Sequence, residues 1–210
     1  MKADYTDITL VVDRSGSMET MQADAEGGIN TFIKEQAGKP GKCLVSLVQF
    51  DSEYEPVWSG VRAADCPRYT LTPRGSTALL DAVGRTIKAT GARLAALPEE
   101  ERPGLVIFVI TTDGMENASS TYTRERVREM IAHQQNVYKW QFTFLAASAD
   151  AFDEGNQLGF DENSLAAHAP DKYYDSSRAL SSKVSRMRAM RMRNEEVDNS
   201  FTEEERKAME

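Results

Sequence analysis

The chain has 210 residues, of which 40% are hydrophobic, and a formal net charge of −8. These values fit one globular domain with a short tail and exclude disorder throughout. The negative charge disfavours a general nucleic-acid or anionic-membrane binder. No apolar run approaches the roughly 18 residues of a membrane span. Two cysteines are too few for a disulfide framework, and no signal-peptide pattern precedes Asp13. We therefore expect a cytoplasmic protein with reduced thiols.

The first apolar run, residues 8–12, is typical of a strand buried on both faces. Asp13 follows this run, and Ser15 and Ser17 follow at two-residue steps, with Gly16 between the two hydroxyls. Carboxylate and hydroxyl oxygens are hard ligands that suit Mg²⁺, Mn²⁺ or Ca²⁺. The same residues could instead cap the next helix. This stretch alone leaves both interpretations open.

Periodicity predicts an alternation of helices and strands along the chain. The expected elements are a helix over 18–37, a strand over 43–50, a short edge strand at 57–58, a helix over 79–97, a strand over 105–110, a helix over 124–136, a strand over 140–147, a short helix over 149–158 and a small strand at 165–167. Gly27 and Gly28 are expected to weaken the first helix, because glycine costs about 1 kcal/mol against alanine in a helix.

This alternation predicts an α/β fold, with a doubly wound, mostly parallel central sheet flanked by helices in a single domain over residues 1–193. In such a fold the loops that leave the carboxyl ends of the strands share one edge of the sheet, where ligands bind. Asp13 and Asp113 each follow a buried strand. We therefore expect the topology to bring them together despite their separation in sequence.

A final helix is predicted over 175–193. Its apolar stripe contains Leu180, Val184 and Met187, and its other side is basic, with Arg178, Lys183, Arg186, Arg188, Arg191 and Arg193. The acidic tail 194–210 is expected to be loosely ordered, to form a short helix from the capping-box pattern of Thr202 and Glu205, or to lie back on the basic helix. We interpret the basic side as a solvent-exposed face that the tail balances; docking of a protein partner or of nucleic acid is the alternative.

A third loop supplies a further hydroxyl, Thr77, in Gly75-Ser-Thr77 just before a predicted helix. With D-x-S-x-S at Asp13, Ser15 and Ser17, and Thr-Asp-Gly at Asp113, the sequence resembles a von Willebrand factor A (vWA) domain with a complete metal-ion-dependent adhesion site (MIDAS). The resemblance implies that all five residues bind a divalent cation, Mg²⁺ or else Mn²⁺ or Ca²⁺, directly or through water. It implies a protein partner that offers an Asp or Glu carboxylate to the ion. It covers roughly residues 5–190 and leaves the tail unexplained.

The strand and loop over 144–152 also resemble the vWA pattern, with Ala146 and Ala147 at a position where glycine is common in the family. Loop residues at the same edge are candidates for partner specificity, and an exposed polar loop residue is the simpler interpretation of each: Arg14, Glu116, Asn117, Ser148 and Asp150. Among vWA proteins, the chain is similar to stand-alone bacterial and phage-borne members, including those of tellurium-resistance type.

The sequence lacks the motifs of the enzyme classes that its polar residues could suggest. A haloacid-type phosphatase needs a second aspartate where the chain has Ser15, and no serine lies in a G-x-S-x-G elbow that His133 or His168 could serve. Phosphate-loop and dinucleotide glycine motifs are absent. We therefore predict a non-enzymatic binding domain. The alternative is an assembly subunit of an ATP-driven machine of the AAA or chelatase type. The oligomeric state does not follow from the sequence.

Overall fold

The computed structural model describes residues 1–210, apart from the side chain of Pro170. A six-stranded sheet has the order β3-β2-β1-β4-β5-β6. Its strands are β1 (Lys2–Asp13), β2 (Lys42–Phe50), β3 (Tyr54–Arg62), β4 (Pro103–Thr112), β5 (Gln141–Ala146) and β6 (Leu165–Ala167). All neighbours are parallel except β2 and β3, which are antiparallel. The predicted doubly wound, mostly parallel sheet is confirmed.

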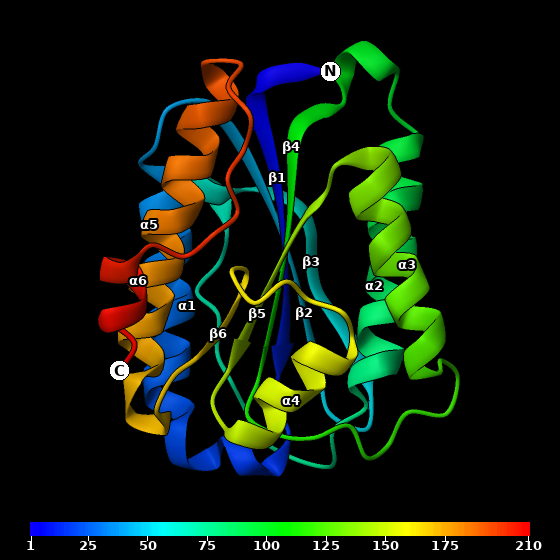
Figure 1. The fold of residues 1–210 in the computed structure, drawn as a ribbon, viewed down its shortest axis with the longest axis vertical. Coiled ribbons are helices and arrows are strands. Elements are labelled where there is room, and N and C mark those ends of the chain that lie inside the picture. Colours follow the sequence, from blue (N-terminus) through cyan, green and yellow to red (C-terminus); the bar gives the residue numbers. More distant parts are fainter.

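Helices cover both faces of this sheet (Figure 1). They are α1 (Gln22–Ala37), α2 (Leu79–Ala95), α3 (Arg124–Tyr138), α4 (Ala149–Gln157), α5 (Tyr173–Met192) and α6 (Glu203–Lys207). In Figure 1, α1 and α5 lie on one side of the sheet, α2 and α3 lie on the other, and α4 lies near the end to which the strands point. No helix within the described residues is long and apolar enough to cross a bilayer.

The two central strands, β1 and β4, send alternate side chains into two separate cores. Leu10 and Val109 belong to the core beneath α1 and α5, whereas Val11 and Phe108 belong to the core beneath α2 and α3. Because both faces are covered, these strands carry continuous apolar runs rather than an alternating pattern. The two apolar runs of the sequence, residues 8–12 and 105–110, therefore form the two central strands of the sheet.

Two details of local structure go beyond the sequence analysis. Helix α1 runs unbroken from Gln22 to Ala37, through Gly27 and Gly28. A Cβ at Gly28 would lie 2.4 Å from the Ser177 Oγ of α5, so the missing side chain lets the two helices pack closely. The edge strand β3 is also longer than the expected 57–58. It pairs with β2 through two register shifts, which hide its period in the sequence.

The expected solvent-exposed basic face of α5 is wrong at two positions. Arg188 is buried, and its guanidinium donates to the carbonyl oxygens of Gln36 at 2.7 Å and Pro40 at 3.0 Å, where α1 ends. Lys183 has 0% of its surface exposed. Its Nζ donates to Thr143 Oγ1 at 3.0 Å and lies 3.8 Å from the centre of the Phe201 ring. Both side chains belong to the interior.

The chain covers Lys183 with its own C-terminal end. We call residues 195–210 the C-terminal strap. It turns back at Asn194, whose φ is +57°, and runs back along α5 to α6 (Figure 1). Phe201 and Met209 of the strap are buried. The strap contains α6, which begins with a capping box between Thr202 and Glu205.

Burial lowers the pKa of Lys183 well below its usual value. The folded state therefore holds this proton less tightly than the unfolded chain does, and the cost of burying the amine falls as pH rises toward the unfolded pKa of about 10.4. We expect Lys183→Met to raise the free energy of unfolding at pH 7 by about 1 kcal/mol or more. The gain should shrink toward pH 9.5.

Urea denaturation at the two pH values measures this effect. The matched control is Lys39→Met at an exposed lysine, which should change stability by less than about 0.5 kcal/mol at both pH values. A destabilised K183M variant would show instead that the contacts of the amine with Thr143 and Phe201 outweigh its desolvation.

Candidate metal centre

The candidate site lies where β1 and β4 end side by side. The parallel register pairs Val12 of β1 with Thr111 of β4, so Asp13 leaves the sheet at the level of Thr112. The loop that precedes α2 lies against the loop after β1, because Gly16 N donates to the Gly75 carbonyl at 3.2 Å. Three loops that are far apart in sequence thus meet at one edge.

Asp13 is fully buried, with 0% of its surface exposed. Its Oδ1 accepts a hydrogen bond from Ser15 N at 2.6 Å, and its Oδ2 accepts one from Thr112 Oγ1 at 2.5 Å. Burial raises the pKa of Asp13 to about 6, and these two hydrogen bonds oppose the rise. The carboxylate is held in a fixed direction at a place where its charge is costly.

The hydroxyls of the first loop lead from Asp13 toward Asp113. Ser15 Oγ lies 3.1 Å from Ser17 Oγ, and Ser17 Oγ donates to Asp113 Oδ1 at 2.8 Å. Ser15 is buried, whereas Ser17 is exposed. Burial raises the pKa of Asp113, and its hydrogen bond from Ser17 opposes the rise. The predicted partners from the first and third loops are therefore in direct contact.

Thr77 reaches the same place from the second loop. Its backbone N donates to Asn117 Oδ1 at 2.9 Å, and Asn117 N donates back to the Thr77 carbonyl at 3.0 Å. A Cβ placed on Gly114 would lie 3.4 Å from Thr77 Oγ1 and 3.8 Å from Ser17 Oγ. Both hydroxyls thus converge beside Gly114. The structure brings all five predicted residues to one site.

The neighbouring candidates for specificity are mostly engaged in holding the loops. Glu116 accepts from Leu80 N at 2.8 Å, in the first turn of α2, and from Ser119 N at 2.6 Å in its own loop. Ser148 Oγ donates to the Asp113 carbonyl at 2.7 Å and caps α4 by accepting from Ala151 N at 3.0 Å. Asp150 is exposed in the first turn of α4.

Arg14 is likewise part of the frame. It is buried and lies 2.9 Å from Asp51 and 2.7 Å from Glu55, and Asp51 also binds Arg74 at 2.7 Å. Two frame residues escaped the sequence interpretation, Asp51 and Thr112. Each had a signal: Asp51 ends the strand of residues 43–50 as Asp13 ends the first strand, and Thr112 directly precedes Asp113.

The donor set is two carboxylates and three hydroxyls. No group of three or more His, Cys, Asp or Glu side chains within the described residues is arranged to hold a metal, so the donors here are rich in hydroxyls. Oxygen donors of this kind suit a hard divalent cation. The charge of Asp113 adds to the rise in the pKa of Asp13. A cation would relieve that repulsion, so the residues present fit a metal ion.

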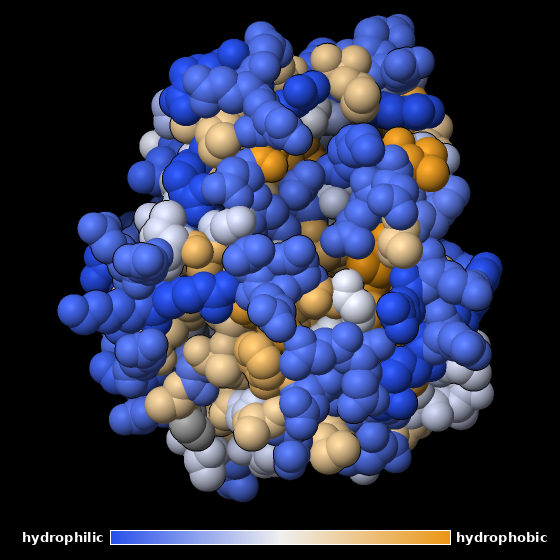
Figure 2. Space-filling model, in the orientation of Figure 1, coloured by the Kyte–Doolittle hydropathy of each residue, from blue (hydrophilic) through white to orange (hydrophobic). Residues whose placement is uncertain are grey.

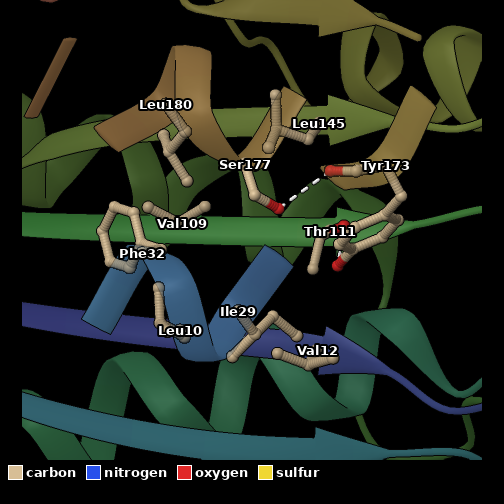
Figure 3. A pocket seen from close by; sticks show the side chains of 10 residues that line it. All are labelled: Leu10, Val12, Ile29, Phe32, Val109, Thr111, Leu145, Tyr173, Ser177 and Leu180. Carbon is tan, nitrogen blue, oxygen red and sulfur yellow. Dashed lines mark hydrogen bonds between the residues drawn. The ribbon is translucent and has the colours of Figure 1, made fainter. Parts of the chain in front are cut away.

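One small cavity lies in the interior of the described part of the chain. Figure 3 shows a cavity on the α1 and α5 side of the sheet, lined by apolar side chains such as Leu10, Phe32 and Leu180. Its volume of about 20 Å³ is close to the space of a single water molecule. Its polar end is Thr111, whose hydroxyl lies 2.8 Å from the Tyr173 hydroxyl. We regard it as a packing defect in the core.

The fold is that of a vWA domain. No family model and no curated protein matches the sequence. Solved structures do match. The vWF domain of the pilus tip protein Mfa5 from Porphyromonas gingivalis aligns over 85% of this chain and 94% of its own, at 11% identity and a TM-score of 0.64. Manganese-loaded TRAP from Plasmodium vivax aligns over 83% of this chain and 72% of its own, at 15% identity and a TM-score of 0.56.

Proximal thread matrix protein 1 from the mussel byssus, with a zinc-occupied MIDAS motif, matches 86% of this chain at 16% identity and a TM-score of 0.59. The chain spans 46% of that protein and 43% of a vWA protein from Catenulispora acidiphila. At these identities the likeness establishes the fold.

The buried carboxylate predicts a stability effect in metal-free protein. Because the pKa of Asp13 is raised in the folded state, that state binds the proton more tightly than the unfolded chain does. The contribution of Asp13 to stability is therefore highest below about pH 4 and falls as pH rises through about 6. In EDTA at pH 8, we expect Asp13→Asn to raise the free energy of unfolding by on the order of 1–3 kcal/mol.

The gain should vanish near pH 4, and denaturant unfolding at both pH values measures it. Asp150→Asn, at an exposed carboxylate, is the control and should show no such pH dependence. Equal stability of wild type and D13N at pH 8 would show that the hydrogen bonds from Ser15 and Thr112 fully offset the burial.

Proposed function

We propose that this chain is a metal-dependent protein-binding domain with a complete MIDAS formed by Asp13, Ser15, Ser17, Thr77 and Asp113. The observation that carries the proposal is the convergence of these five oxygen-bearing side chains from three loops on one edge of the sheet. The metal-loaded states in the names of the TRAP and mussel structures support a divalent cation at this edge.

The donor chemistry favours Mg²⁺, with Mn²⁺ or Ca²⁺ as substitutes. Two carboxylates balance the charge of a dication, and hydroxyls add none, so the ion keeps its attraction for a further anionic oxygen. That oxygen would come from an Asp or Glu carboxylate of a protein partner. Ser17 is exposed and Asp113 only half-buried, so this side of the site is open to such a ligand.

The remaining features of the proposal come from the sequence. We propose a non-enzymatic, cytoplasmic role as a stand-alone vWA domain of the bacterial or phage type. The chain lacks the sequence motifs of a hydrolase nucleophile, a phosphate loop or a dinucleotide fold. Adhesion through an ion needs no such groups, because the ion itself bridges the two proteins.

The first experiment is titration calorimetry with Mg²⁺ and Mn²⁺. Asp113→Ala should abolish binding of both ions and leave the fold unchanged, because Asp113 is half-buried at the sheet edge and lies outside both cores. Asp150→Ala, at an exposed carboxylate on the same edge, should bind like wild type. Circular dichroism checks the fold of each variant.

A pull-down in Mg²⁺ or in EDTA then tests the protein-binding step. A partner retained only in Mg²⁺, and lost with D113A, is the expected result. Metal binding that survives D113A would contradict the assigned site. Copurification of an ATPase would favour the assembly-subunit alternative.

A further inference from the structure

The C-terminal strap covers a surface of β5 and α5 at the far edge of the sheet, and we call this covered surface the groove. Strand β6 pairs with Phe144–Ala146 of β5 only, so within the described chain residues 141–143 have no strand neighbour on that side. The strap fills this position between β5 and α5. Figure 2 shows mainly hydrophilic side chains on the outer surface of this part of the molecule, over α6 and the strap.

The side chain of Asn199 binds the edge of β5 at the place where an added strand would pair. Its Nδ2 donates to the Phe142 carbonyl at 2.7 Å, and its Oδ1 accepts from Thr143 Oγ1 at 3.1 Å. Recognition of a free strand edge through its backbone groups is a common way to bind peptides. The side-chain amide thus satisfies a backbone acceptor that a longer β6 would otherwise have paired.

Phe201 is the apolar anchor, two residues further on. It is buried and joins the core cluster that contains Leu180 and Val184 of α5. Its backbone N donates to the Asn163 carbonyl at 2.9 Å, so the chain position of the ring is fixed. Together with Asn199, the ring defines a recognisable Asn-x-Phe motif.

Charge complementarity surrounds the motif. The strap carries acidic side chains before and after it, and Arg186 of α5 contacts Asp198 at 3.5 Å and Glu205 at 3.3 Å. The same guanidinium donates to the Ser200 carbonyl at 2.6 Å. The groove therefore presents a cation to an acidic chain on either side of the apolar anchor.

Lys183 makes the strap easier to release than its contacts suggest. The strap buries this amine completely and leaves it one hydroxyl partner, Thr143, and the face of Phe201. Burying an amine without a carboxylate partner costs free energy, which is recovered when water returns. Methionine or leucine at position 183 would pack against the strap without that cost. A lysine at this position therefore favours a strap that can dissociate from the groove.

We propose that this groove is a docking site for an acidic peptide of a partner protein that carries an Asn-x-Phe motif, and that the C-terminal strap occupies it as an intramolecular competitor. This docking site is at the β6 edge and is independent of the proposed metal function. A free peptide must displace a tethered segment, whose effective concentration is in the millimolar range. Weakening the strap should therefore open the groove to a peptide added from outside.

The test uses full-length chains and a fluorescent synthetic peptide of residues 195–210, with binding followed by anisotropy. The Phe201→Ala and Asn199→Ala chains should bind the peptide at least tenfold more tightly than wild type does. The control is Glu196→Ala, because Glu196 is exposed and makes no hydrogen bond or ion pair among the described residues. It should behave like wild type. A peptide that carries both N199A and F201A should not bind.

Circular dichroism checks that each chain is folded. N199A removes only polar contacts, so it tests the proposal even where F201A loses part of its core. Folded F201A and N199A chains that bind the peptide no better than wild type would overturn the proposal. Sedimentation of the wild type should show a monomer; a dimer that the peptide dissociates would overturn the proposal by identifying a second copy as the occupant.

Discussion

The burial of Asp13 at the end of the central strand is the constraint on which the candidate site depends. Its carboxylate is fixed by Ser15 N and Thr112 Oγ1, and the parallel register of β1 and β4 sets the position of both donors. A charged oxygen in this place is costly to the metal-free fold, as the raised pKa of Asp13 shows. A cation bound at the proposed site would offset this cost.

The other proposed ligands depend on loops that are held by hydrogen bonds rather than by regular structure. Arg74 N donates to the Arg14 carbonyl at 2.8 Å, and Asn117 bonds to both backbone groups of Thr77. Glu116 and Ser148 fix the remaining loops to the starts of α2 and α4. Ligand sites need such support, because small errors in the direction of a ligand weaken ion binding. Most polar residues around the site serve this frame.

A different physical problem is solved at the β6 edge. A short edge strand leaves backbone groups of its neighbour without partners, which invites pairing with other chains. The C-terminal strap covers this edge with Asn199 and Phe201, at the cost of a buried amine at Lys183. The core of β1 and β4 is apolar on both faces, whereas the strap combines two buried apolar side chains, Phe201 and Met209, with polar contacts to β5 and α5.

The sequence by itself determined the doubly wound sheet, because continuous apolar runs that alternate with amphipathic helices have few other solutions. It also predicted that Asp13 and Asp113 meet, because both follow buried strands and parallel strands end at one edge, and the proposed metal ligands rest on this placement. The roles of Gly28, Arg188 and Lys183 could not be predicted, because each is decided by a residue far away in sequence that packs against it: Ser177, Gln36 and Phe201. Only the tertiary structure separates a proposed ligand such as Ser17 from a frame residue such as Glu116, since both are polar loop residues and differ only in what they touch.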